Sequence, residues 1–117
     1  MQATTPQTIP LVHVNALNFQ QEVLEADMGV LVDVSSAWCS PCRAAEPVLR
    51  QISAEQQEHL KIVKLDAEQA PDLIARLGVR GFPTFVFFRS GQEVGRHAGF
   101  RGPRQLRAWI ADLLANA

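Results

Sequence analysis

Two cysteines, Cys39 and Cys42, are the residues of this chain whose type and spacing best support chemistry. They are its only cysteines, and they stand three positions apart. This spacing lets the two sulfurs meet across one helical turn and form a disulfide reversibly. The ring that such a disulfide closes is small, and loop entropy gives it only roughly 2 kcal/mol of stabilisation. We therefore expect redox chemistry at this pair rather than a structural cross-link.

The two cysteines are expected to have different roles because a helix is predicted to begin at or near Cys42, directly after a buried strand. The first turn of a helix leaves backbone N–H groups unpaired and carries partial positive charge, which favours a thiolate at Cys39. Cys39 is therefore the expected nucleophile. Cys42 lies inside the first turn and is the expected resolving thiol, which attacks the mixed disulfide formed by Cys39.

Three different uses of the cysteine pair compete with redox chemistry. Zinc would need two further ligands, and the histidines show no metal-ligand spacing, so we expect no metal. The second use is an iron–sulfur cluster shared between subunits, and the third is a pair of inert buried thiols. Two cysteines are too few for a disulfide-rich secreted scaffold or a four-thiolate zinc ribbon. The histidines are His13, His59 and His97.

Two charged residues interrupt apolar strands. Asp33 stands within the run 30–34 and Lys64 within 62–65. A carboxylate in a core costs several kcal/mol if unpaired, and burial raises its pKa, so Asp33 is a candidate proton carrier. The two residues can meet as a buried pair across adjacent strands, or both can lie at strand ends and reach water. The pattern leaves both arrangements open.

The tripeptide Phe82-Pro83-Thr84 precedes the most apolar predicted strand. Proline cannot donate to a sheet ladder, so it is expected at a strand start or edge, where neighbouring backbone groups stay free to pair with another chain. Most X–Pro bonds in folded proteins are trans. By themselves, these residues therefore predict a trans Phe82–Pro83 bond.

The elements that position these residues follow from hydrophobic periodicity and from Gly and Pro positions. Pro47 falls inside a predicted helix and predicts a kink there. Gly29 and Gly78 are expected to end helices, and Ser90-Gly91 to form a hairpin turn. Strands are predicted over 11–14, 30–34, 61–66, 85–88 and 92–97, and helices from Asn15 or Asn18 to about Asp27, over 43–57 and 71–77, and for about thirteen residues from Pro103.

The resulting order βαβαβαββα predicts an α/β fold with a mixed five-stranded sheet flanked by four helices. With 117 residues, of which 47% are hydrophobic and 20% charged, the chain suits one domain with one core. Residues 1–10 mix Thr, Gln and Pro and are expected to form a flexible segment, with the domain over 11–117.

Composition also restricts the expected partners and compartment. The formal net charge of -1 gives no overall field for nucleic acid or anionic lipid. The chain has no apolar run of membrane-spanning length, and its first residues do not look like an export signal. We therefore expect a cytoplasmic protein, in which the cysteine pair is kept mostly reduced.

Taken together, these motifs resemble the thioredoxin family from about Leu11 to Leu114. The resemblance rests on Trp38-Cys39-Ser40-Pro41-Cys42, preceded by Asp33 and followed by Pro47, Lys64, Phe82-Pro83-Thr84 and Gly99. It implies the five-stranded fold of that family, dithiol–disulfide exchange, and a cis Phe82–Pro83 bond beside the cysteines. It also implies that Asp33 helps to deprotonate Cys42, with Lys64 nearby, and that Pro47 kinks the helix. The implied substrate-docking surface comprises Trp38, Gly81, Phe82, Pro83, Gly99 and Phe100.

The function implied by this resemblance is that of a protein disulfide reductase without a bound cofactor. Its electrons would come from NADPH through a thioredoxin reductase, its substrates would be disulfide-containing proteins, and it would act as a monomer. A disulfide oxidase or isomerase, or a binding module with incidental cysteines, is the competing function. Packing is the competing role for Trp38 and Phe100. Ser40 stands where the family commonly has glycine, and Ser35 where it commonly has an indole; both departures bear on the redox potential and on reductase recognition.

Overall fold

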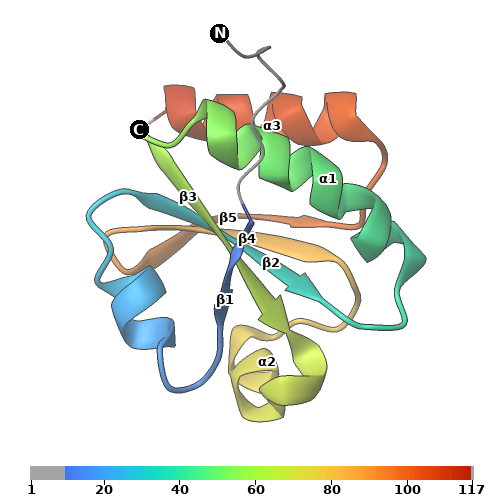
Figure 1. The fold of residues 1–117 in the computed structure, drawn as a ribbon. Coiled ribbons are helices and arrows are strands. Elements are labelled where there is room, and N and C mark those ends of the chain that lie inside the picture. The colour runs from blue at the N-terminus through green and yellow to red at the C-terminus, as the bar shows by residue number, and fades with distance from the viewer. Residues whose placement is uncertain (1–9, 117) are drawn as a thin grey trace, which may run out of the picture.

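A five-stranded mixed sheet forms the centre of the molecule in the computed structural model, which describes residues 10–116 (Figure 1). The strand order is β1-β3-β2-β4-β5. β1, β3 and β2 are parallel, whereas β4 is antiparallel to both β2 and β5. The predicted α/β fold is thus confirmed. The strands are β1 (Val12–Val14), β2 (Gly29–Ser35), β3 (Leu60–Asp66), β4 (Thr84–Arg89) and β5 (Gln92–Ala98).

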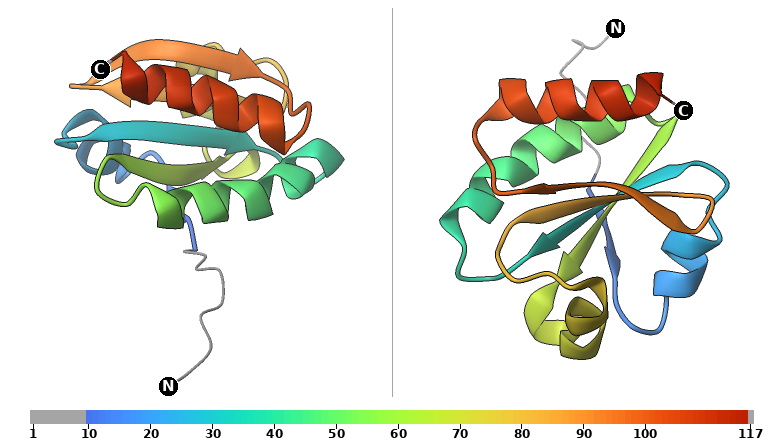
Figure 2. Two further views of the ribbon diagram at one scale, coloured as in Figure 1. Left: turned by 90° about the horizontal axis from the view of Figure 1, so that it is seen from above. Right: turned by 180° about the vertical axis from the view of Figure 1, so that it is seen from behind.

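Helices cover both faces of this sheet (Figures 1 and 2). α1 (Ser40–Glu55) and α3 (Pro103–Ala115) lie side by side over one face. α2 (Pro71–Leu77) and a short π-helix, η1 (Gln20–Leu24), cover the other. A single 3₁₀ turn, η2 (Ala67–Gln69), joins β3 to α2. Most of the predicted flexible segment 1–10 lies outside the described residues.

Side-chain alternation along β2 divides the core into two layers and points one acid toward α1. All seven residues of β2 are buried, as expected for a central strand covered on both faces. Val30, Val32 and Val34 belong to the layer under η1 and α2, whereas Leu31 belongs to the layer under α1 and α3. Because side chains alternate with a period of two, Asp33 shares the α1 face with Leu31.

The predicted first helix is the main difference from expectation. In place of a helix from Asn15 or Asn18 to Asp27, the chain makes a turn followed by the five residues of η1. The Asn15 side chain accepts hydrogen bonds from the N–H groups of Leu17 and Asn18, and Asn18 accepts one from the N–H of Asn15. These local bonds offer the backbone an alternative to the helix. The prediction that Gly29 ends a helix was also wrong, since Gly29 begins β2.

The remaining elements begin and end close to the predicted residues. α2 has the predicted bounds, with Gly78 as its left-handed cap at φ 69°. Ser90 and Gly91 both have positive φ and form the two-residue turn between β4 and β5, as predicted. α1 begins at Ser40 rather than Arg43, because Cys39 caps it, and Pro47 lies inside this helix.

Gly29 is required by close packing and gives a test of this core. A Cβ added at Gly29 would lie 2.5 Å from Cζ of the fully buried Phe87. We expect Gly29→Ala to lower the free energy of unfolding by about 1–3 kcal/mol, measured by urea denaturation, because Phe87 must shift within a packed layer. Gly81→Ala is the control, since nothing lies within 4 Å of the added Cβ. Equal losses in the two variants would contradict this packing.

Candidate active site

The N-terminus of α1 holds both cysteines. Cys39 is the N-cap residue, with extended backbone, and its sulfur accepts a hydrogen bond of 3.1 Å from the backbone N–H of Cys42. Pro41 lies in the first turn, where its missing N–H leaves no hydrogen bond unmade. Cys39 and Cys42 form a disulfide, with their Cα atoms 5.2 Å apart. The two sulfurs therefore lie where the unpaired N–H groups and the positive end of the helix dipole act.

Solvent reaches the two cysteines unequally. Cys39 is half-buried, whereas Cys42 is only 4% exposed. A bulky disulfide substrate can therefore approach Cys39 more readily than Cys42. The difference follows from their positions, because Cys39 precedes the first helical turn and Cys42 faces inward from it.

Glu68 braces the loop between β2 and the cysteines, and the sequence pattern did not single it out. Its carboxylate accepts a hydrogen bond of 2.6 Å from the Ser36 hydroxyl and one of 3.1 Å from the Ala37 N–H. The bond from Ser36, followed by those with Asp66 and Ala37, lowers the pKa of Glu68 to about 2. The only available signal was the strand pairing: Glu68 lies two residues after the end of β3, and the last residue of β3 is the register partner of the last residue of β2.

The loop before β4 reaches the same end of the sheet. Thr84 is the register partner of both Val34 and Ala98, so Pro83 adjoins the end of β2. The Phe82–Pro83 bond is cis, so the trans bond expected from the residues alone was wrong and the cis bond implied by the resemblance is confirmed. The Thr84 hydroxyl donates to the Gly81 carbonyl at 2.7 Å, and the Gly99 N–H donates to the Pro83 carbonyl at 2.8 Å. These contacts join three separate segments of the chain. The general frequency of cis X–Pro bonds takes no account of such contacts, and the expectation of a trans bond rested on that frequency alone.

The residues expected to form a docking surface differ in exposure. Trp38 is 89% exposed, so the packing role considered for this residue was wrong. Phe82 and Phe100 are half-buried and each packs against a different core layer. Pro83 is buried, Gly81 is exposed and Gly99 is half-buried. The strand register brings their three segments, before α1, before β4 and after β5, to one end of the sheet.

Asp33 is buried beneath α1 and is 1% exposed. Among the described residues, neither of its carboxylate oxygens has a hydrogen-bond partner. Burial raises the pKa of Asp33 to about 7; the positive charge of Lys64 opposes this rise and the negative charge of Glu46 adds to it. A carboxyl in this state exchanges its proton near neutral pH.

Lys64 lies beside Asp33 but pairs with a different acid. The two residues are register partners on β3 and β2. The Lys64 ammonium, however, makes its hydrogen bond to Glu46 of α1, at 2.5 Å, and its side chain is 24% exposed. Neither predicted arrangement therefore holds in full: Asp33 is not at a strand end, and it is not ion-paired. Sequence reasoning missed Glu46, which lies one helical turn beyond Cys42 and competes for the ammonium.

Two further observations concern the described chain as a whole. Between residues 10 and 116, no group of three or more His, Cys, Asp or Glu side chains is arranged to hold a metal ion. None of the helices in that part of the chain has the length and apolar character needed to cross a membrane.

The fold and the cysteine pair at the start of α1 define a thiol–disulfide oxidoreductase, and comparisons with known proteins specify the family. The thioredoxin family profile matches residues 10–112. A thioredoxin of Pseudomonas aeruginosa is 37% identical over 100 residues, which cover 86% of this chain and 93% of the relative. A thioredoxin of Rickettsia bellii is 33% identical over 93 residues, covering 80% and 89%. A bifunctional thioredoxin reductase/thioredoxin of Mycobacterium leprae is 34% identical over 105 residues, covering 90% of this chain and 23% of the relative.

The chain belongs to the thioredoxin family. It is a protein disulfide reductase that works by thiol–disulfide exchange, as the sequence predicted. The disulfide between Cys39 and Cys42 is the oxidised form of its redox centre.

The raised pKa of Asp33 predicts that the free energy of unfolding depends on pH. In the unfolded chain this carboxyl ionises from about pH 3.8, but in the folded protein only near pH 7. The folded state therefore binds the extra proton between these values, and its stability falls as the pH rises through that window. Relative to Asp33→Asn, the oxidised wild type should lose up to about 4 kcal/mol between pH 4 and pH 8.

Urea unfolding of both proteins at pH 4, 6 and 8 measures this difference. All other titrating groups are shared, so they cancel in the comparison. A difference in unfolding free energy that stays constant with pH would contradict the assignment of the shift to Asp33.

Proposed function

We propose that Cys39 attacks the substrate disulfide and that Cys42 resolves the resulting mixed disulfide. The observation that carries this assignment is the difference in exposure at the N-terminus of α1, where Cys39 is accessible and Cys42 is covered. The Cys42 N–H, which donates to the Cys39 sulfur, supports a thiolate at Cys39 in the reduced protein.

The proposed reaction has two exchange steps. The Cys39 thiolate attacks one sulfur of the substrate disulfide, forms a mixed disulfide and releases the other substrate sulfur as a thiolate. Cys42 then loses its proton and attacks the Cys39 sulfur. The second substrate thiolate leaves, and the Cys39–Cys42 disulfide forms. Two electrons pass from the cysteine pair to the substrate, whose thiolates take up protons.

We propose that Asp33 accepts the Cys42 proton in the second step. Its burial on the α1 face, two residues beyond Leu31, and its pKa of about 7 support this role. A carboxyl with an ordinary pKa would be a weaker base toward a thiol near neutral pH. Lys64, its register partner, supplies a nearby positive charge that stabilises the ionised carboxylate.

We propose that protein substrates dock on the surface around the cysteines. An indole that is 89% exposed beside Cys39 supports this proposal, because Trp is enriched among the few residues that carry most of the binding energy of an interface. The loop around the cis proline adds backbone groups at the same end of the sheet. The proposed surface comprises Trp38, Gly81, Phe82, Pro83, Gly99 and Phe100.

We propose that a thioredoxin reductase restores the dithiol with electrons from NADPH and that the protein acts as a cytoplasmic monomer without a bound cofactor. The name of the Mycobacterium leprae relative, which pairs a thioredoxin reductase with a thioredoxin, supports the reductase partner. A disulfide reductant also needs a compartment in which thiols are kept reduced, which supports the cytoplasm. NADPH oxidation after addition of a bacterial thioredoxin reductase tests the electron source, and subcellular fractionation tests the compartment.

Single cysteine variants test the assigned roles. In the insulin reduction assay with dithiothreitol, Cys39→Ser should lower the rate to that without protein, because the remaining thiol, Cys42, is buried. Reduced Cys42→Ser, freed of dithiothreitol before it is mixed with insulin, should instead accumulate a mixed disulfide with insulin, visible by non-reducing electrophoresis and mass spectrometry. The double variant, which cannot form the mixed disulfide, is the matched control. Equal residual turnover in the two variants would contradict the assignment, and trapping by Cys39→Ser alone would reverse it.

Trp38→Ala tests the proposed docking surface. Loss of a large aromatic contact at an interface costs about 1–2 kcal/mol. The KM of this protein for insulin, or the KM of thioredoxin reductase for this protein, should therefore rise about tenfold with little change in kcat. Leu17→Ala is the matched control, because Leu17 is 95% exposed and belongs to the turn before η1, away from α1. An unchanged KM in Trp38→Ala, or an equal rise in both variants, would contradict docking at Trp38.

A further inference from the structure

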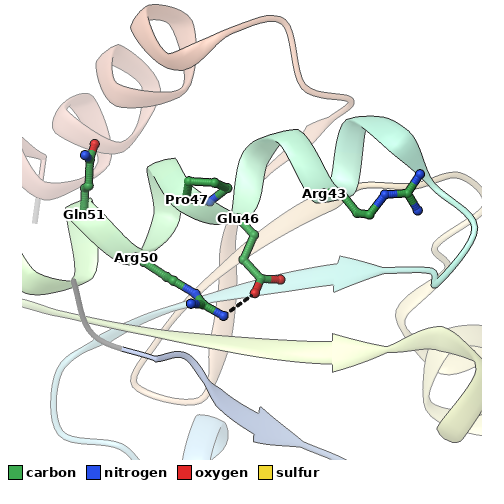
Figure 3. A pocket seen from close by; sticks show the side chains of 5 residues that line it. All are labelled: Arg43, Glu46, Pro47, Arg50 and Gln51. Atoms are coloured by element: carbon green, nitrogen blue, oxygen red, sulfur yellow. Dashed lines mark hydrogen bonds and ion pairs between the residues drawn. The ribbon is translucent and has the colours of Figure 1, made fainter.

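Glu46 links the surface of α1 to the buried acid of the redox site. It lies four residues after Cys42, one helical turn further along α1. Its two carboxylate oxygens have different partners. Oε1 accepts a hydrogen bond of 2.5 Å from the Lys64 ammonium, and Oε2 accepts one of 2.7 Å from the Arg50 guanidinium. In Figure 3, the Glu46 side chain extends from α1 toward the strands, and the dashed line marks its pair with Arg50. One acid on the helix thus binds two cations.

Lys64 has more than one acidic neighbour, but its ammonium forms a hydrogen bond with only one of them in the described part of the chain. Asp33 is its register partner on β2, and Asp66 lies two residues further along β3. Both acids feel the charge of Lys64. Within the described part of the chain, however, the ammonium donates its side-chain hydrogen bond to Glu46 alone. The oxygens of Asp33 are left without a partner.

The other charged and titratable groups around Asp33 do not replace Lys64. On β3 these are Lys64 and Asp66, and on α1 they are Glu46 and, behind it, Arg50. The register partner of Asp33 on β4 is the apolar Phe85, which separates it from His97 of β5. From α3, Arg107 pairs with Glu55 near the other end of α1. Cys42 is the remaining titratable group, once it is reduced.

We propose that Glu46 is a positioning residue of the resolving step: it holds the Lys64 ammonium on the helix side and so prevents Lys64 from pairing with the Asp33 carboxyl. The proposal rests on the proposed role of Asp33 as proton acceptor. An ion pair between Lys64 and Asp33 would stabilise the carboxylate and weaken it as a base toward Cys42. Glu46 also adds its own negative charge near Asp33, which acts in the same direction.

The first test is the titration of Asp33 in Glu46→Gln, followed by carbon-13 NMR of its carboxyl in the oxidised protein, where the cysteines do not titrate. With Lys64 released and one negative charge removed, the midpoint of Asp33 should fall by about one pH unit. Glu55→Gln is the matched control: it removes the same charge from the same helix, but Glu55 pairs with Arg107 and not with Lys64. The midpoint in this control should stay at the wild-type value.

Two further variants separate positioning from a general disturbance of the fold. Glu46→Asp keeps the negative charge and should retain more of the wild-type midpoint than Glu46→Gln does. In a Lys64→Met background, Glu46→Gln should shift the midpoint by less than in the wild type, because no ammonium is left to release. Shifts of equal size in the two backgrounds would overturn the proposal, since Glu46 would then act without Lys64.

The second test is the pH dependence of the resolving step. Stopped-flow measurement follows the release of the substrate thiol when Cys42 attacks a mixed disulfide formed on Cys39. In Glu46→Gln the midpoint of this rate should move to lower pH with that of Asp33. An unchanged Asp33 titration would overturn the role of Glu46 and leave the roles of the cysteines intact. A shifted titration with an unchanged rate profile would overturn both this proposal and the proton transfer to Asp33.

Discussion

Complete burial of β2 is the constraint on which the rest of the molecule depends. This strand lies between β3 and β4 and is covered on both faces, so all seven of its residues are buried. Its alternation places Asp33 beneath α1, and its end leads directly to Cys39. Pairing with β3 and β4 brings Lys64 and the cis proline to the same region. The redox centre is therefore positioned by a central strand whose residues are all buried.

Burial of an acid without a hydrogen-bond partner opposes folding, and the same burial supplies a base near neutral pH. A core residue of similar volume would pack there at lower cost. Such a local violation of the rules for a stable core is characteristic of functional sites, where stability is lost for the sake of chemistry. The surrounding layers of Val, Leu and Phe side chains offset that loss.

In the segment between β2 and α1, residues that are not typical of the family surround the cysteine motif, and side-chain hydrogen bonds fix the loop. Ser35 and Ser40 depart from the residues common in the family, and Ser35 is buried at the end of β2. The adjacent Ser36 hydroxyl and the Ala37 N–H are fixed by the ionised Glu68 from the neighbouring strand connection. On the other side, Arg43 donates to the Ala37 carbonyl and to the Ser40 hydroxyl. The loop that presents Cys39 is thus held from two directions by charged side chains.

The sequence by itself determined the order of the elements, the helix that begins at the cysteine pair, the α2 bounds with the Gly78 cap and the Ser90-Gly91 hairpin. Periodicity, caps and turn residues act over a few positions, so they can be read locally. The partner of Lys64, the cis Phe82–Pro83 bond and the Glu68 brace were decided only by the tertiary structure. Most of these depend on competition between groups from separate segments: Lys64 can choose among three acids, and only the packing of α1 on β3 brings Glu46 within reach.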